Sequence, residues 1–165
     1  MITVNHKELL AAVKTASLAV DRKSTMPILA CLELKATGGI LSVRGTDLTN
    51  EIVVTLPCEG EFHQAIDAKA LLTTVAAVGG KSKKSSPAIN LTETPGQVEV
   101  RGSCGAVSLT VSLSPKDFPR CYSVVGDNIL YGTKQFKSAL DFVLPAVSTD
   151  TTRYHLNGVC LALRE

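Results

Sequence analysis

Apolar residues along the chain recur with two different periods. A three- and four-residue spacing, typical of an amphipathic helix, occurs at Leu9, Leu10, Val13, Ala16 and Val20, and again at Leu71, Leu72, Val75 and Val78. Strict alternation, typical of a strand with one buried face, occurs over residues 89–92, 98–101 and 108–113. The pattern predicts two helices among several antiparallel strands.

The chain also repeats itself. Gly39-Ile-Leu-Ser-Val-Arg-Gly45 and Gly96-Gln-Val-Glu-Val-Arg-Gly102 share a G-x-x-x-V-R-G pattern at an offset of 96 − 39 = 57 residues. Each copy follows a helical stretch and leads into an alternating strand, residues 51–56 or 106–111. Asp67 and Gly79-Gly80 are signals for the start and end of the second helix.

Each repeat is therefore predicted to be a strand, a helix and three strands. An ordinary α+β domain with a chance similarity is the alternative, and duplication is favoured because helix, motif and strand agree in order. We expect an α+β fold with the two helices on one face of antiparallel sheets.

A third, shorter unit is predicted from Asn128 onward. It consists of a short strand, a helix with Thr133 as N-cap, an interruption at Pro145 and a strand over residues 153–163. The apolar residues of this unit are Phe136, Leu140, Val143, Leu156, Val159 and Leu161. We expect them to form an apolar surface that further sequence should cover, and the final strand to offer an unpaired edge, which is a template for pairing between chains. The tail is therefore expected either to be mobile or to dock on a second copy of the chain.

Composition limits the possible functions. Charged residues make up 19% of the chain with a net charge of +2, so any nucleic-acid contact must come from a local basic patch. Five cysteines, widely spaced and odd in number, argue against a zinc site or a disulfide scaffold. Without a signal peptide or a long apolar run, the sequence predicts a cytoplasmic protein.

No constellation for catalysis stands out in the sequence. His6, His63 and His155 are solitary, and neither a phosphate-binding glycine loop nor a nucleophile elbow is present. We therefore expect no catalytic residues, no metal and no cofactor, and predict that the chain is not an enzyme.

Four short motifs occur in an order and spacing that point to a known family. They are Thr25-Met-Pro-Ile-Leu29, Gly45-Thr-Asp-Leu48, Asp117-Phe-Pro119 and Arg153-Tyr-His-Leu-Asn-Gly-Val159. From Ile2 to its end, the chain resembles the bacterial DNA polymerase III beta subunit, the DNA sliding clamp.

The resemblance implies a DNA clamp fold within a ring of two subunits, each with three similar domains. Helices line the hole around duplex DNA, and sheets lie outside. It further implies that residues 1–122 are the complete first domain and 123–165 a linker and the opening of an incomplete second one. DNA polymerase III and the clamp loader are the implied partners, together with a second copy of the chain.

The resemblance also indicates residues that contact DNA. Lys23, beside Arg22 in the loop before a predicted Met26–Leu29 strand, and Lys69 match basic family positions, and exposed cations neutralise phosphates without reading sequence. Arg153 and Tyr154 belong to a motif that follows a DNA-facing loop. A solvated surface charge is the alternative for each lysine and arginine, and is at least as good an explanation for Lys14 and Lys137.

Three further residues receive other roles. Leu156 matches a position in the family's apolar pocket for peptides of polymerases and the clamp loader, although core packing is the favoured role here. Asp150 departs from the side chain expected near phosphate and is excluded from the DNA contacts. Asp47 is interpreted as a turn residue whose carboxylate bonds nearby amides.

Two functions are compatible with these observations. The first is a sliding clamp, or an N-terminal fragment of one, that tethers the replicative polymerase to duplex DNA without sequence specificity. The alternative is a stand-alone clamp-like protein that self-associates or regulates a full-length clamp.

Overall fold

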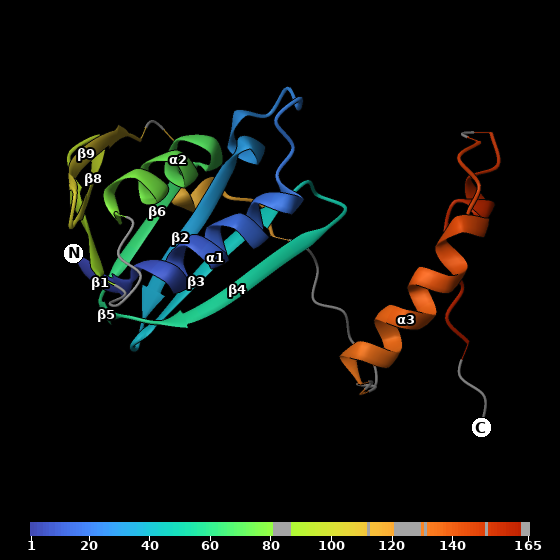
Figure 1. Cartoon of the computed structure of the whole chain (residues 1–165). Helices are drawn as coiled ribbons and strands as arrows, with labels where there is room; N and C mark the ends of the chain where they lie inside the picture. The colour runs from blue at the N-terminus through green and yellow to red at the C-terminus, as the bar shows by residue number, and fades with distance from the viewer. Residues whose placement is uncertain (81–86, 112, 121–129, 131, 151, 163–165) are drawn as a thin grey trace. The chain divides into compact units, whose positions relative to one another are not determined.

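The computed structural model describes residues 1–80, 87–111, 113–120, 130, 132–150 and 152–162. The chain divides into two compact units, Met1–Tyr122 and Ser123–Glu165 (Figure 1). No helix in the described part is long and apolar enough to cross a membrane.

The first unit contains two successive repeats of one strand, one helix and three strands. The first repeat is β1 (Ile2–Asn5), α1 (His6–Ala16), β2 (Cys31–Thr37), β3 (Ile40–Thr46) and β4 (Glu51–Pro57). The second is β6 (Phe62–Asp67), α2 (Ala68–Val78), β7 (Ala88–Thr94), β8 (Gln97–Gly102) and β9 (Gly105–Thr110). A two-residue strand, β5 (Glu59–Gly60), lies between them. The predicted α+β class and element order are confirmed.

The two repeats exchange their first strands. Strand β1 pairs with β7, and β6 pairs with β2, so each first strand joins the sheet of the other repeat. The resulting sheets have the orders β5-β1-β7-β8-β9 and β4-β3-β2-β6, and all their strand pairs are antiparallel. Neither repeat can complete its sheet alone.

The helices and both sheets share one hydrophobic core. Helix α1 packs on β3 and β4, α2 packs on β8 and β9, and the two helices pack against each other (Figure 1). Fully buried side chains of the core include Leu9, Val13, Leu32, Leu34, Val43, Leu71, Val75, Ile89 and Leu91. Because burying such a side chain is worth about 1.5–3 kcal/mol, this core is the main source of stability.

The last glycine of each G-x-x-x-V-R-G copy lies against a helix end. A Cβ at Gly45 would stand 2.3 Å from the carbonyl oxygen of Ala16, and one at Gly102 would stand 2.4 Å from that of Val78. Ala16 and Val78 are the last residues of α1 and α2. The same close approach in both repeats gives the motif a physical cause and favours duplication over chance similarity.

The predicted boundaries of the second helix are confirmed. Asp67 is its N-cap, with the carboxylate accepting a hydrogen bond from the backbone N–H of Ala70 at 2.7 Å. Gly79 is the C-cap, and Gly80 follows with φ +69°, in the left-handed region.

Short 3-10 helices connect several of these elements. They are η1 (Ser17–Ala19), η2 (Pro27–Ala30) and η3 (Pro115–Asp117). The predicted Met26–Leu29 strand is wrong, because η2 occupies this segment. Pro27 stands at the start of η2, where its fixed φ suits a helical turn and its missing N–H costs no hydrogen bond.

The second unit contains α3 (Thr133–Val143), η4 (Leu144–Ala146) and η5 (Tyr154–Leu156). Helix α3 ends just before Pro145, as predicted, but its N-cap is Gly132 and not Thr133. The predicted strand over residues 153–163 is wrong, since the described residues 152–162 contain η5 and no strand. A strand needs a neighbour for its backbone groups, and no described residue of this unit forms one. The short strand predicted from Asn128 lies largely outside the described residues.

Candidate nucleic-acid interface

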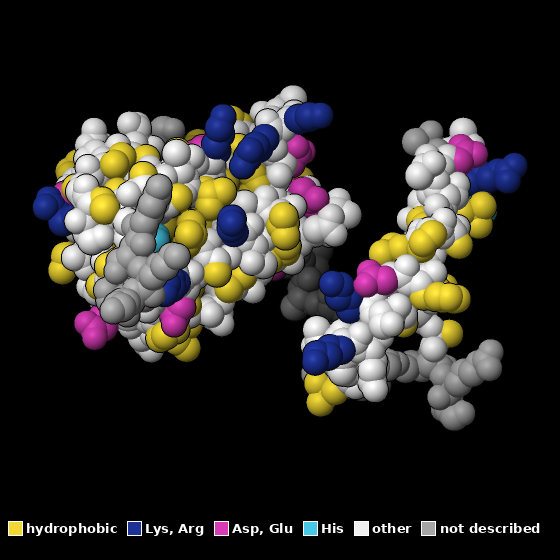
Figure 2. Space-filling view, in the orientation of Figure 1, with side chains coloured by type: hydrophobic (Ala, Val, Ile, Leu, Met, Phe, Trp, Pro, Cys, Tyr) yellow, Lys and Arg dark blue, Asp and Glu magenta, His cyan; other side chains and the backbone are white. Residues whose placement is uncertain are grey.

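The outward faces of α1 and α2 form a surface in which positive charge exceeds negative charge. The exposed side chains of the two helices are Lys7, Glu8, Ala11, Lys14, Thr15, Lys69, Thr73, Ala76 and Ala77. Glu8 is the single acidic residue along the two helices. Figure 2 shows Lys and Arg side chains on this face, whereas most Asp and Glu side chains lie toward its edges. The small Ala and Thr side chains leave room for a phosphate backbone.

The loop between η1 and η2 adds two exposed cations to this unit. Asp21 holds the loop through two hydrogen bonds. Its carboxylate accepts one from the backbone N–H of Lys23 at 2.9 Å, and its own backbone N–H donates one to Leu29 O at 3.1 Å. Arg22 and Lys23 are exposed, and neither takes part in any ion pair between described residues. Both cations are therefore available to an external anion.

Lys69 lies in the first turn of α2 and is exposed. A positive charge near a helix N-terminus is mildly unfavourable, and the Asp67 carboxylate two residues earlier offsets it. The exposed residues that follow on α2 are uncharged, so no acidic neighbour on this helix competes for the ammonium group of Lys69.

Arg153 and Tyr154 belong to the second unit and are largely exposed, with 68% of the Arg153 side chain and 82% of Tyr154 accessible. Asp150 lies beside them. The Asp150 carboxylate accepts two hydrogen bonds from Thr152, one from the hydroxyl at 2.7 Å and one from the backbone N–H at 2.9 Å. These hydrogen bonds hold the pKa of Asp150 below its ordinary value. Asp150 Oδ2 also lies 3.9 Å from Arg153 Nε and so offsets part of the arginine charge.

Leu156 and Lys137 also lie in the second unit. Leu156, in η5, is 46% exposed, so the described residues do not bury it in a core. Helix α3, in the same unit, has no buried residue. Lys137 is exposed on α3.

Lys7 is a further cation on α1 that no motif in the sequence indicated. It lies seven residues before Lys14, a spacing that places two side chains on the same helix face, and both are exposed. That spacing was a readable signal for a basic face on α1.

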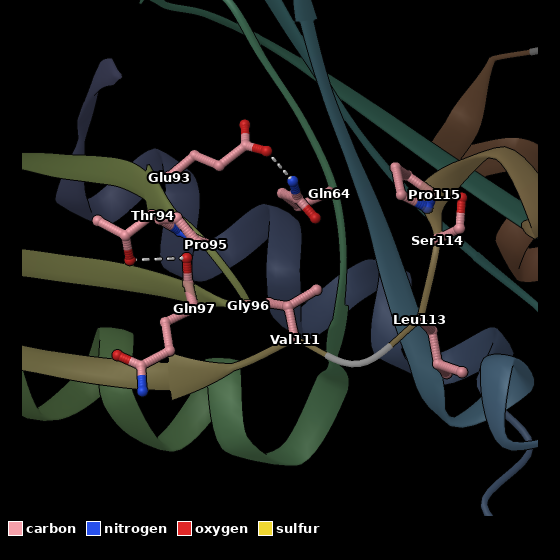
Figure 3. A pocket seen from close by; sticks show the side chains of 10 residues that line it. All are labelled: Gln64, Glu93, Thr94, Pro95, Gly96, Gln97, Val111, Leu113, Ser114 and Pro115. Atoms are coloured by element: carbon pink, nitrogen blue, oxygen red, sulfur yellow. Dashed lines mark hydrogen bonds between the residues drawn. The ribbon is translucent and has the colours of Figure 1, made fainter.

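The first unit also contains a pocket that none of these cations lines (Figure 3). Its walls are the β7–β8 turn at Thr94–Gln97 and the segment from Leu113 to Pro115, and the Gln64 amide donates a hydrogen bond to the Glu93 carboxylate at its edge. The described residues that line it include no Lys or Arg, so it does not suit an anion. Among the described residues, no three His, Cys, Asp or Glu side chains gather as a metal site requires.

Comparisons with known proteins agree on one family. Residues 1–119 match the model of the DNA polymerase III beta subunit, N-terminal domain. The chain is 27% identical over 164 residues to the beta sliding clamp of Caulobacter vibrioides strain NA1000 / CB15N, covering 96% of this chain and 42% of that protein.

Solved structures are similar over the same extent. The Caulobacter crescentus pol III beta structure superposes with a TM-score of 0.82 at 27% identity, covering 95% of this chain and 42% of that one. The DNA polymerase III subunit beta from Pseudomonas aeruginosa has a TM-score of 0.83 at 23% identity, covering 96% and 43% of the two chains. The chain thus spans less than half the length of these relatives.

Two helices packed side by side on antiparallel sheets, in duplicated units, define the fold as a DNA clamp fold. The match over residues 1–119 makes the assignment more specific. The chain belongs to the family of the DNA polymerase III beta subunit, N-terminal domain.

Proposed function

We propose that this chain supplies a clamp domain of a DNA sliding clamp that tethers the replicative DNA polymerase to duplex DNA. Residues 1–122 act as the complete first clamp domain, and residues 123–165 as a linker and the opening of a second. The observation that carries the proposal is the basic surface of α1 and α2, on which Glu8 is the single acid, in a chain of the beta-subunit family.

The proposed contacts are with phosphates. Lys23, Lys69 and Arg22 neutralise backbone charge, and contacts with phosphates carry no sequence information. Binding without sequence preference is what a protein that moves along DNA requires. Arg153 and Tyr154 of the second unit add a phosphate contact and a surface for packing on sugar or base.

The remaining parts of the proposed function follow from family membership. The polymerase and the clamp loader are the expected protein partners, with Leu156 as a contributor to an apolar peptide pocket. The chain acts by tethering and not by catalysis. Because it spans 42% of the related clamp, a closed ring around DNA needs further domains.

A titration with a labelled duplex tests the DNA contacts. With about three or four phosphates neutralised, the logarithm of affinity should fall against the logarithm of salt concentration with a slope near −3. The double variant Lys23→Glu, Lys69→Glu should bind more weakly with a shallower slope. Lys35→Glu is the control. Lys35 is exposed on β2, and because its neighbours Leu34 and Ala36 face the core, its side chain points away from the helices. Unchanged affinity and slope in the double variant would contradict the assignment.

A second candidate function is self-association of a clamp-like interaction protein. The exposed apolar side chains of the second unit favour it: Leu130 is 96% exposed, Phe142 87% and Leu161 71%. Light scattering tests this function, since a concentration-dependent dimer that Phe142→Ser and Leu161→Ser abolish would support it. A monomer at all concentrations would exclude it.

A further inference from the structure

Charged side chains form a row across the outer face of the four-stranded sheet. The Arg44 guanidinium lies 3.1 Å from Glu51 Oε1 and 3.5 Å from Glu33 Oε2. The His63 Nε2 lies 2.9 Å from Glu33 Oε1. These residues come from β4, β3, β2 and β6, so the row crosses every strand of this sheet with Glu33 as the shared acceptor.

Glu33 is buried on the face of the sheet that points away from the core. Its neighbours Leu32 and Leu34 lie in the core, and because side chains alternate along a strand, Glu33 points to the opposite face. It is nevertheless only 2% exposed. A buried carboxylate is costly unless cations and hydrogen-bond donors surround it, so something must cover Glu33 and supply that charge.

The segment that follows β9 supplies both. Phe118 is 5% exposed and packs in a small cluster with Ile28, Leu29, Cys31 and Ala65. Ala65 is the residue of β6 paired directly with Glu33, so Phe118 packs on the strand position next to Glu33.

Arg120 completes the cover on the carboxylate itself. Two residues after Phe118, its Nη2 donates to Glu33 Oε1 at 3.5 Å, while 56% of the arginine side chain stays accessible. The segment is thus held at two adjacent points, one apolar and one ionic.

We propose that Glu33 is a positioning residue that latches the segment leaving the first unit to the outer face of the sheet. Phe118 provides the hydrophobic anchor, and the Glu33–Arg120 contact fixes the point from which the chain departs. Arg44 and His63 hold the carboxylate in place for this contact. This role stands on the geometry of the first unit and does not depend on DNA binding.

Hydrogen exchange of the whole chain, followed by mass spectrometry of the peptide that covers residues 114–120, measures the latch. The backbone N–H groups of Asp117 and Phe118 are bonded to Ser114 O and Pro115 O, so their exchange reports opening of the segment. Arg120→Gln should raise their exchange rate about threefold to fivefold, the effect of losing one partly exposed ion pair. Arg120→Lys, which keeps a cation, should restore most of the protection.

Two comparisons separate a latch from a general loss of stability. Glu33→Gln should raise exchange in the same segment, and adding Arg120→Gln to it should raise exchange little further, because the Glu33–Arg120 contact is already lost. Raising the salt concentration should speed exchange in the unaltered chain but not in Arg120→Gln.

Arg101→Gln, which breaks the exposed Glu99–Arg101 pair on β8, is the control and should leave the segment unchanged. Unchanged exchange in Arg120→Gln, or fully additive effects in the double variant, would overturn the proposal.

Discussion

The imidazole ring of His6 lies directly against the backbone of Gly79. A Cβ at Gly79 would stand 2.0 Å from Nε2 and 2.2 Å from Cε1 of this ring. His6 Nε2 also lies 3.1 Å from Val75 O, and because a carbonyl only accepts, Nε2 carries the donated proton. The first residue of α1 is thereby joined to the last turn of α2 and to the residue that follows it.

This relationship predicts an unusual response to Gly79→Ala. Gly79, the C-cap of α2, has φ −76° and ψ −18°, a conformation that alanine adopts without strain and in which Gly→Ala normally stabilises by about 0.4–1 kcal/mol. Collision with the His6 ring should reverse that sign and destabilise the unit by about 1–3 kcal/mol. In a His6→Ala background the same substitution should be neutral or stabilising. Urea unfolding followed by circular dichroism measures both, and an equal effect in the two backgrounds would refute the ring contact.

Substitution of the motif glycines should be at least as damaging as Gly79→Ala. At Gly45 and Gly102 the added Cβ meets backbone carbonyl oxygens, which cannot move aside as a side chain can. Gly45→Ala and Gly102→Ala should each lower the free energy of unfolding by about 1–3 kcal/mol or more. Gly158→Ala is the control, because its Cβ would meet nothing within 4 Å. Thermal unfolding is the measurement. Equal melting temperatures for all three variants would contradict the close approach of the glycines to the helix ends.

A negative charge on the exposed face of α2 should weaken DNA binding. Thr73 is exposed one turn after Lys69, so Thr73→Glu places a carboxylate beside the proposed phosphate contact. Repulsion of about 1 kcal/mol at short range corresponds to an affinity loss of about fivefold at low salt. Thr55→Glu on β4 is the matched control. Its neighbours Val54 and Leu56 pack on the core, so the exposed Thr55 side chain points to the face of the sheet opposite the helices. Equal affinity of the two variants for duplex DNA would show that DNA does not bind on the exposed face of α2.

The turn between β3 and β4 should stabilise the fold in a pH-dependent way. Hydrogen bonds from the side chain and backbone N–H of Asn50, and from the N–H of Thr49, hold the pKa of Asp47 below its ordinary value. A lowered pKa in the folded state gives stability that is present above the unfolded pKa and lost as pH falls through the folded one.

The stability difference between the unaltered chain and Asp47→Asn should therefore be largest near neutral pH and shrink below about pH 4. Asn50→Ala, which removes the largest cause of the shift, should reduce this pH dependence. Denaturant titrations between pH 2.5 and pH 7 provide the measurement. A difference that stays constant over this range would show that the carboxylate charge plays no part.

Local signals in the sequence were sufficient for much of the first unit. The alternation over residues 98–101 and the cap at Asp67 each depend on neighbours in the chain, and both features are present as predicted. Segments whose structure depends on distant partners were predicted less well. Among the described residues none pairs with the predicted 153–163 strand, and Pro27 starts a 3-10 helix where a Met26–Leu29 strand was predicted.

The functional residues also divide into those that local sequence predicts and those that depend on distant partners. The exposure of Lys23 and Lys69 was expected from their positions in a loop and on a helix. The cluster at Glu33 could not be foreseen, because Arg120 is 87 residues away along the chain and meets the carboxylate only after the sheet has formed. Burial of a single glutamate inside an alternating strand leaves no distinct mark in the sequence.

The exchange of β1 and β6 makes the first unit the covalent counterpart of a strand-swapped dimer. If the linking strand β5 and its flanking residues were cut, each half would still carry a strand that fits only the other half. Such an arrangement is what fusion of two swapped subunits of an ancestral homodimer would leave behind. Because each sheet needs a strand from the other half, we expect the two halves to unfold together, and the long-range pairing of β1 with β7 should make folding slow.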